Sequence, residues 1–143
     1  MPWMSVLETT MKSKPFPWEC GECGEVAVRP VRAPYYYAKV KHDNKLHSFT
    51  VLNLDIPTCA SCGERVFCNS TEVVISAALR RHLGLLTPEQ IRSGIAATRQ
   101  TQSEFSDQTG IAAETISRWV TGTVIQSHAM DKYLRLVFAT YIR

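Results

Sequence analysis

The sequence predicts an α+β protein in which a small metal-stapled antiparallel β domain precedes an all-α bundle. Three features support this prediction: two Cys-x-x-Cys pairs, a β-branched and aromatic segment between them, and short helical segments with clear caps after residue 86. A chain of 143 residues suits two small domains, because a bound metal can compensate for a small core. We expect a metal-binding domain at 1–70, a linking helix at 71–86 and a helical domain at 87–143.

Four cysteines form two closely spaced pairs, Cys20-Gly-Glu-Cys23 and Cys59-Ala-Ser-Cys62, each followed by a glycine. This pattern is typical of zinc knuckles, in which four thiolates satisfy tetrahedral Zn²⁺ and glycine lets backbone amides fold over the sulfurs. A closed site of this kind leaves no position for water or substrate, so we expect one structural zinc per chain in a zinc-ribbon-like domain. The alternative is a set of buried reduced thiols. The fifth cysteine, Cys68, we expect to be a small buried hydrophobe and not a ligand or an oxidation sensor.

The segment between the cysteine pairs favours strands. β-branched and aromatic residues dominate from Val26 to Ile56, where Tyr35–Val40 and Phe49–Leu54 flank a polar turn at His42–Lys45. This pattern predicts a small antiparallel sheet whose ends carry the cysteines. Prolines and aromatics in residues 1–19 predict an extended lead-in whose first dozen residues are loosely held.

Tyrosines and histidines in this region allow two interpretations each. Tyr35–Tyr37 could stack nucleobases, but alternate residues of a strand face opposite sides, so we expect the tyrosines to pack within the sheet. The four histidines could ligate a metal, but none has a paired spacing, and we expect surface or turn positions for them. They are His42, His47, His82 and His128.

Helical spacing begins in the predicted linking helix, where Val74, Ala78 and Leu85 share one face. Beyond it, capping boxes begin at Thr87 and Thr101, and glycines at 110 and 122 mark helix ends. These signals predict helices near 88–99, 102–109, 112–120 and 128–141. The expected inward positions are Ile91, Ile95, Phe105, Ile111, Ile116, Trp119, Leu134 and Phe138.

The last predicted helix carries two apolar faces. The first lies at Met130, Leu134, Phe138 and Tyr141, and includes the two inward positions of this helix, Leu134 and Phe138. The second, at Tyr133, Leu136 and Val137, indicates either a partner, such as a second copy of the chain, or a fully buried helix.

Residues 102–119, Gln102-Ser-Glu-Phe-Ser-Asp-Gln-Thr-Gly110-Ile-Ala-Ala-Glu-Thr-Ile-Ser-Arg-Trp119, resemble the helix-turn-helix of the phage-repressor-like (Xre) family. The resemblance implies that the second helix lies in the major groove of DNA. Because Ile116 and Trp119 bury one face of that helix, the opposite face would meet base edges or phosphates. The DNA-binding candidates are Gln102, Ala113, Glu114, Ser117, Arg118 and Thr121.

Arg118 is the strongest base-reading candidate, because a guanidinium can donate two hydrogen bonds to guanine, although it could also clamp a phosphate. The family often places an amide against a phosphate where Gln102 stands, and Thr121 is a weaker phosphate candidate together with Thr101, Ser103 and Thr123. Glu114 departs from the family, because a carboxylate repels phosphates unless it accepts from a cytosine amine.

The order of parts resembles the MqsA (YgiT-like) antitoxin family over nearly the whole chain: cysteine knuckles, a linking helix and a C-terminal Xre-type helix-turn-helix. The resemblance implies a C-terminal domain that dimerises on a palindromic operator and represses transcription, and a zinc domain that binds a protein toxin. The lead-in before Cys20 and the long insert between the knuckles depart from the family pattern. The alternative is a zinc-containing transcriptional regulator without a toxin.

Charge and composition narrow the function classes further. The net charge is only +3, so DNA binding would depend on local donors and not on a strong overall field. Apolar stretches fall short of a membrane span, no signal pattern is present and five cysteines do not pair evenly, so we expect a cytoplasmic protein without a membrane partner. No nucleophile–base arrangement or open metal site is evident, so we do not expect an enzyme.

Overall fold

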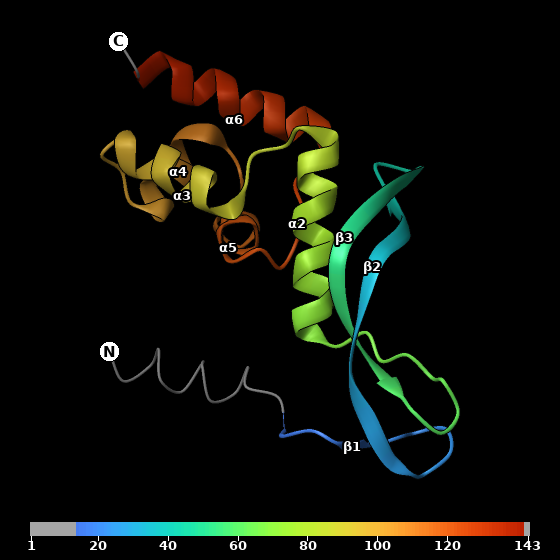
Figure 1. The fold of residues 1–143 in the computed structure, drawn as a ribbon. Helices are drawn as coiled ribbons and strands as arrows, with labels where there is room; N and C mark the ends of the chain where they lie inside the picture. Colours follow the sequence, from blue (N-terminus) through green and yellow to red (C-terminus); the bar gives the residue numbers. More distant parts are fainter. Residues whose placement is uncertain (1–13, 142–143) are drawn as a thin grey trace. The chain divides into compact units, whose positions relative to one another are not determined.

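The computed structural model describes residues 14–141 and confirms an α+β fold, with an antiparallel sheet followed by helices (Figure 1). The predicted loose segment at the start of the chain lies outside the described residues. The elements are β1 (Trp18–Glu19), β2 (Val26–His42), β3 (Lys45–Cys59), α2 (Asn69–Leu83), α3 (Pro88–Ala97), α4 (Gln102–Thr109), α5 (Ala113–Thr121) and α6 (His128–Tyr141).

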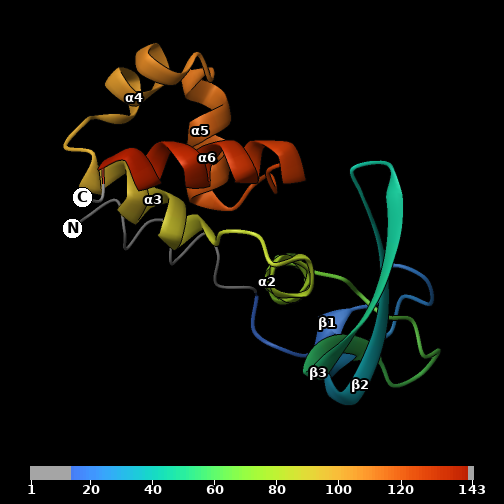
Figure 2. The same cartoon turned by 90° about the horizontal axis from the view of Figure 1, so that it is seen from above.

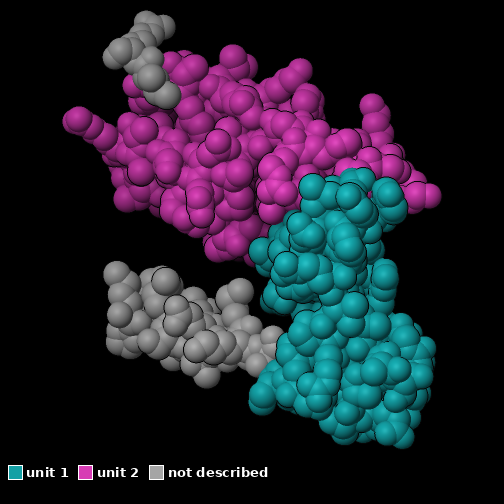
Figure 3. Space-filling view, in the orientation of Figure 1, with its two compact units in different colours: residues 1–37, 50–75 teal, residues 38–49, 76–143 magenta. Residues whose placement is uncertain are grey.

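The described residues group into two compact units (Figure 3). Unit 1 contains residues 14–37 and 50–75, and unit 2 contains residues 38–49 and 76–141. Strands β2 and β3 and helix α2 therefore each contribute residues to both units. The predicted boundaries at 70/71 and 86/87 stay a prediction.

A long hairpin is the main feature of the sheet, whose strand order is β1-β2-β3 (Figure 2). Asp43 and Asn44 form the turn with φ angles of 52° and 62°, which is the left-handed pair that a two-residue type I′ turn requires. The predicted turn at His42–Lys45 is confirmed. In β3 the φ of Asn53 is also positive, at 53°, and this break in the alternation lets Val51 and Leu54 both be buried.

The tyrosines of β2 differ from the prediction. Tyr35 and Tyr37 are 67% and 75% exposed, so the expectation that they pack within the sheet is wrong. Tyr36 alone packs, against Phe67 at a ring distance of 5.8 Å. The physical reason is the alternation of side chains along the strand, which directs Tyr36 to one face and its two neighbours to the other.

Helix α2 spans Asn69–Leu83, so it begins earlier and ends earlier than the predicted 71–86. Gly84 ends it with a φ of 70°, and the amide of Leu85 donates to the Arg80 carbonyl over 2.9 Å, as in a Schellman motif. Of the predicted inward face, Ala78 and Leu85 are buried as expected, but Val74 is 43% exposed and Ile75 is buried in its place.

Helices α3–α6 form a bundle within unit 2, in which α5 contacts α3 and α4, and α6 contacts α3. Both capping boxes are confirmed, at Thr87 and Thr101. Helices α4 and α6 match their predicted ranges, whereas α3 ends at Ala97 and α5 begins one residue late, at Ala113. All eight positions predicted to point inward are buried, and they form one apolar cluster with Val120.

Helix α6 is not fully buried. Leu136 and Tyr133 are 68% and 37% exposed, so its second face is open to solvent within unit 2. Tyr141, the last residue of the first apolar face, is 38% exposed and accepts a hydrogen bond from the Gln108 side chain, so its side chain lies at the edge of the bundle. None of the helices that the structure describes is long and apolar enough to cross a bilayer.

A buried polar network ties the start of α6 to the segment before α3. Asp131 Oδ1 accepts from the Leu86 amide over 2.8 Å and from the Gln126 side chain over 3.0 Å, while its Oδ2 pairs with Arg135 over 2.8 Å. Arg135 also donates to the Gly84 carbonyl. Because Gln126 and Asp131 are both 2% exposed, these hydrogen bonds replace contacts with water.

Candidate metal centre and exposed face of helix α5

The two cysteine turns have the same local geometry. In the first, the Gly24 amide donates to the Cys20 carbonyl over 2.9 Å, and in the second, the Gly63 amide donates to the Cys59 carbonyl over 2.8 Å. The φ angles of the two glycines are 78° and 79°, which residues with a Cβ seldom adopt. The glycines therefore make the tight turns that bring each pair of thiols together.

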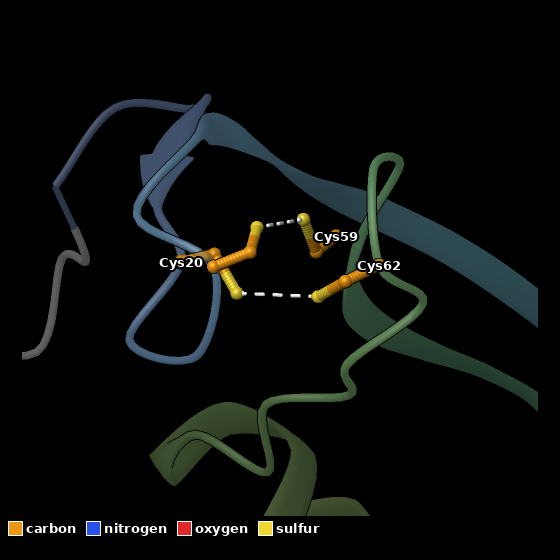
Figure 4. A group of neighbouring side chains, drawn as sticks. Cys20, Cys59 and Cys62 are labelled. Carbon is orange, nitrogen blue, oxygen red and sulfur yellow. Dashed lines mark hydrogen bonds between the residues drawn. The ribbon is translucent and has the colours of Figure 1, made fainter.

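These turns bring four sulfurs into one cluster (Figure 4). The Sγ atoms of Cys20 and Cys62 are 3.6 Å apart, as are those of Cys23 and Cys59, and all four lie within 4.8 Å of one another. A tetrahedral ion with sulfur ligands at about 2.3 Å sets its sulfurs about 3.8 Å apart, whereas a disulfide needs about 2.0 Å. The four residues therefore fit a metal site and do not form disulfides.

Packing around the cluster is consistent with a metal-supported fold. Cys20 and Cys59 are buried with Val28, and the half-buried Trp18 and Val66 pack against them. Cys23 and Cys62 are exposed. This is a very small apolar core, so a metal bound to the four sulfurs would supply much of the stability of this region.

Ionisation of the thiols is uneven. A hydrogen bond from the Cys62 backbone amide is the main cause that lowers the pKa of Cys59 to about 7. The backbone amide of Glu64 acts in the same direction on Cys62, but desolvation and the neighbouring thiols outweigh it and raise the pKa of Cys62 to about 12. Some thiols must therefore lose protons when a metal binds, so metal affinity should fall as the pH falls.

The other candidate ligands are not members of this cluster. Cys68 Sγ contacts the hydroxyls of Ser70 and Thr71 at 3.1 and 3.4 Å, at the start of α2. His42, His47 and His82 form a row of imidazoles in unit 2, with successive ring centres 6.4 Å apart. In the described part of the chain, the four cysteines are the one group whose ligand atoms are close enough to share an ion.

The predicted DNA-binding residues all lie at the surface of the bundle. Three residues, Gly110–Ala112, separate α4 from α5, and Gly110 has a φ of 78°. On α5, Ile116, Trp119 and Val120 are buried, and the remaining predicted positions form an exposed face. The exposed candidates are Ala113, Glu114, Ser117, Arg118 and Thr121, together with Gln102 at the start of α4.

The two ends of α5 are held differently. At the amino end, Ala112 makes no side-chain cap. At the carboxyl end, Gly122 adopts the left-handed conformation, and the guanidinium groups of Arg80 and Arg92 donate to the Gly122 and Val120 carbonyls. Neither arginine was predictable from the sequence, because no local pattern relates a residue of α2 or α3 to a helix end 42 or 28 positions later, respectively.

The chain matches no protein-family model and no curated protein. The resemblances to the Xre and MqsA families therefore depend on the motifs themselves.

Proposed function

We propose that this chain is a DNA-binding transcriptional repressor with a structural zinc site. The observation that carries the proposal is helix α5, which follows α4 after three residues, buries Ile116, Trp119 and Val120, and exposes a polar face. A short helix that is anchored on one side and polar on the other suits insertion into a major groove. In this proposal α4 and α5 are a helix-turn-helix of the phage-repressor type.

Arg118 is the residue that we expect to contribute most to recognition. It is exposed, lies on the same face as Ser117 and Glu114, and takes part in no ion pair among the described residues. Its guanidinium is therefore available to donate two parallel hydrogen bonds to a guanine edge. Glu114 acts in the opposite direction to Arg118 near phosphates, because its carboxylate repels them. It favours an approach to a cytosine amine.

Gln102 and Thr121 would contact the DNA backbone. Gln102 is the first residue of α4, where free helix amides and an exposed amide side chain can bind the same phosphate. Thr121 is less free, because its hydroxyl already donates to the Ser117 carbonyl over 2.9 Å. We therefore expect a larger effect from Gln102 than from Thr121.

A homodimer on a palindromic operator would follow from the exposed second face of α6. Tyr133, Leu136 and the half-buried Val137 offer an apolar surface for a second copy of the chain. Two recognition helices about 34 Å apart would then match two half-sites one turn of DNA apart. The proposal predicts a pseudo-palindromic binding site.

Zinc is the metal that the four-thiolate cluster favours, because Zn²⁺ accepts four sulfurs in a tetrahedron and has no redox demand. The role would be structural, since four protein ligands leave no open position. Elemental analysis of the purified protein checks this identity, and iron in the site would contradict it.

The antitoxin hypothesis adds a protein toxin bound by the zinc unit. It predicts that a small reading frame beside this gene stops growth when it is expressed alone, and that co-expression of this chain restores growth. A neighbouring frame without such an effect would favour the alternative, a zinc-containing regulator without a toxin.

The decisive test is a titration of the zinc-loaded chain against its own promoter fragment and against unrelated DNA, at two salt concentrations. We expect selective binding that weakens with salt, and a loss of about 1–3 kcal/mol for Arg118→Ala. Arg81→Ala is the matched control, because Arg81 is also an exposed arginine but belongs to α2 and not to the proposed face of α5. Equal weak binding to both DNAs would refute the repressor proposal, and unchanged affinity for Arg118→Ala would remove Arg118 from recognition.

A further inference from the structure

Two arginines from different helices hold the carboxyl end of α5. Arg92 of α3 donates to the Val120 carbonyl over 2.6 Å, and Arg80 of α2 donates to the Gly122 carbonyl over 3.4 Å. These carbonyls belong to the last turn of α5 and its cap, where helix geometry leaves acceptors unpaired. A cation at this end also interacts favourably with the helix dipole.

Backbone hydrogen bonds occupy the neighbouring acceptors. The Gly122 amide donates to the Trp119 carbonyl over 3.2 Å, and the Val124 amide donates to the Arg118 carbonyl over 3.3 Å. Backbone amides thus pair two of the carbonyls at the carboxyl end of α5, and the two guanidinium groups pair two more. Since Ala112 provides no side-chain cap at the other end, α5 is fixed mainly by its buried face and by its carboxyl end.

Arg80 differs from an ordinary surface arginine. It is 5% exposed, and among the described residues it takes part in no ion pair. Its Nε is buried without a hydrogen-bond partner, and burial lowers the pKa of the guanidinium. A buried charge without a carboxylate is costly, so an apolar side chain of similar length would stabilise the fold equally well or better.

The overall free energy of unfolding therefore gives no reason for an arginine at this position. The hydrogen bond to the Gly122 carbonyl, which holds the end of α5 locally, does give one. We propose that Arg80 is a positioning residue that fixes the carboxyl-terminal turn of α5, the turn next to Arg118. The consequence for DNA affinity rests on the proposed function. The effect on the order of α5 itself does not.

The experiment compares Arg80→Met with Arg81→Met in the full zinc-loaded chain. Arg81 is the next residue in the last turn of α2 and is exposed. Its variant therefore also removes one arginine charge but removes no hydrogen bond to α5. Three quantities are measured: amide hydrogen exchange along α5, the unfolding midpoint of unit 2, and the affinity for the promoter fragment at several salt concentrations.

For Arg80→Met we expect the amides of Gly122 and Val124 to exchange about tenfold faster, while those of Ile91 and Ile95 in α3 keep their rates. The unfolding midpoint should stay or rise, because a buried unpaired charge is removed. Promoter affinity should fall about fivefold. The salt slope should not change, because Arg80 touches no phosphate. Arg92→Met should act in the same direction, and Arg81→Met should leave exchange in α5 unchanged.

Several results would overturn the proposal. Unchanged exchange at the end of α5 would show that Arg80 does not order it. A lower midpoint together with faster exchange throughout α3 and α5 would make Arg80 a general stabilising residue. A salt slope reduced by about one unit would make it a phosphate contact. If the unaltered chain does not bind its promoter, the repressor function fails, and hydrogen exchange still decides the role of Arg80.

Discussion

Asp131 is a buried carboxylate of unit 2 that needs several hydrogen-bond donors at once. Its carboxylate is 2% exposed and is satisfied by the Leu86 amide, the Gln126 side chain and the Arg135 guanidinium. Burial alone would raise the pKa of Asp131, but these three donors together lower it below its ordinary value. The network fixes the segment before α3 against the start of α6, and a disturbance of one member leaves the others unpaired.

Asp131→Asn should therefore destabilise the helical unit by about 2 kcal/mol at neutral pH, because Arg135 loses its charged partner. Since the pKa of Asp131 is lower in the folded chain, its contribution is complete above its unfolded pKa of about 3.9 and is lost as pH falls through the folded pKa. The gap between variant and wild type should thus be constant near pH 7 and narrow below about pH 4. Urea unfolding at several pH values measures it.

The adjacent residue offers a matched control for this network. Lys132 is exposed on the same turn of α6, so Lys132→Ala should change stability little. A gap for Asp131→Asn that widens as the pH falls would contradict the assigned direction of the pKa shift.

At the scale of elements, helices α3 and α6 approach each other closely at Gly94. A Cβ added there would lie 2.6 Å from Phe138 Cδ2 and Cζ and closer still to Cε2, which is well inside contact distance. Phe138 itself is buried against Phe105, with ring centres 5.8 Å apart, so the ring has little room to move. The absence of a side chain at Gly94 therefore sets the spacing of these two helices.

Gly94→Ala tests this close approach. In an open helix the change would stabilise by about 1 kcal/mol. Here it must displace a buried aromatic ring, at a cost of about 1–3 kcal/mol, so we expect a net loss of stability. Ser93→Ala, one residue earlier and exposed, should show the propensity gain alone. A Gly94→Ala chain that is more stable than wild type in urea unfolding would show that Phe138 relaxes freely.

The elements that the sequence predicted well are those with local signals. The capping boxes at Thr87 and Thr101 placed the starts of α3 and α4 correctly, and the turn residues Asp43 and Asn44 lie where the hairpin turn was expected. On α2 only Val74 was placed wrongly, because residues 69–83 contain more apolar positions than one face can hold, and tertiary packing buries Ile75 and leaves Val74 exposed.

At the scale of the whole molecule, the candidate metal centre was predictable because cysteine spacing encodes it, whereas long-range polar contacts were not. The contact between Arg80 and Gly122 spans 42 positions, and the contact between Asp43 Oδ2 and the His128 amide spans 85. The second contact belongs to unit 2, which includes the hairpin tip as well as helices α3–α6. Which segments share a compact unit depends on such distant contacts, and no periodicity reports them.

The two units should respond differently to loss of the metal. Around the cysteine turns, unit 1 has only the small apolar cluster of Cys20, Val28 and Cys59, whereas unit 2 has the large cluster that includes Phe105 and Trp119. Because the metal would supply much of the folding free energy of the cysteine turns, chelation should unfold them. Helices α3–α6 should persist, since their stability comes from their own core.

Circular dichroism and amide exchange on the zinc-loaded chain, before and after chelation, test this prediction by following helix content and amide protection. We expect protection to be lost at Cys20 to Val28 and at Cys59 to Val66, and to be kept at Ile116 and Leu134.

Cys59→Ser should reproduce the effect, and Cys68→Ser should retain one zinc per chain, because Cys68 Sγ contacts hydroxyls outside the cluster. Acidification should act as chelation does, because protons compete with the metal for the thiolates. Cysteine turns that stay protected without metal would contradict a structural role, and helices that melt together with them would show that the two units fold as one.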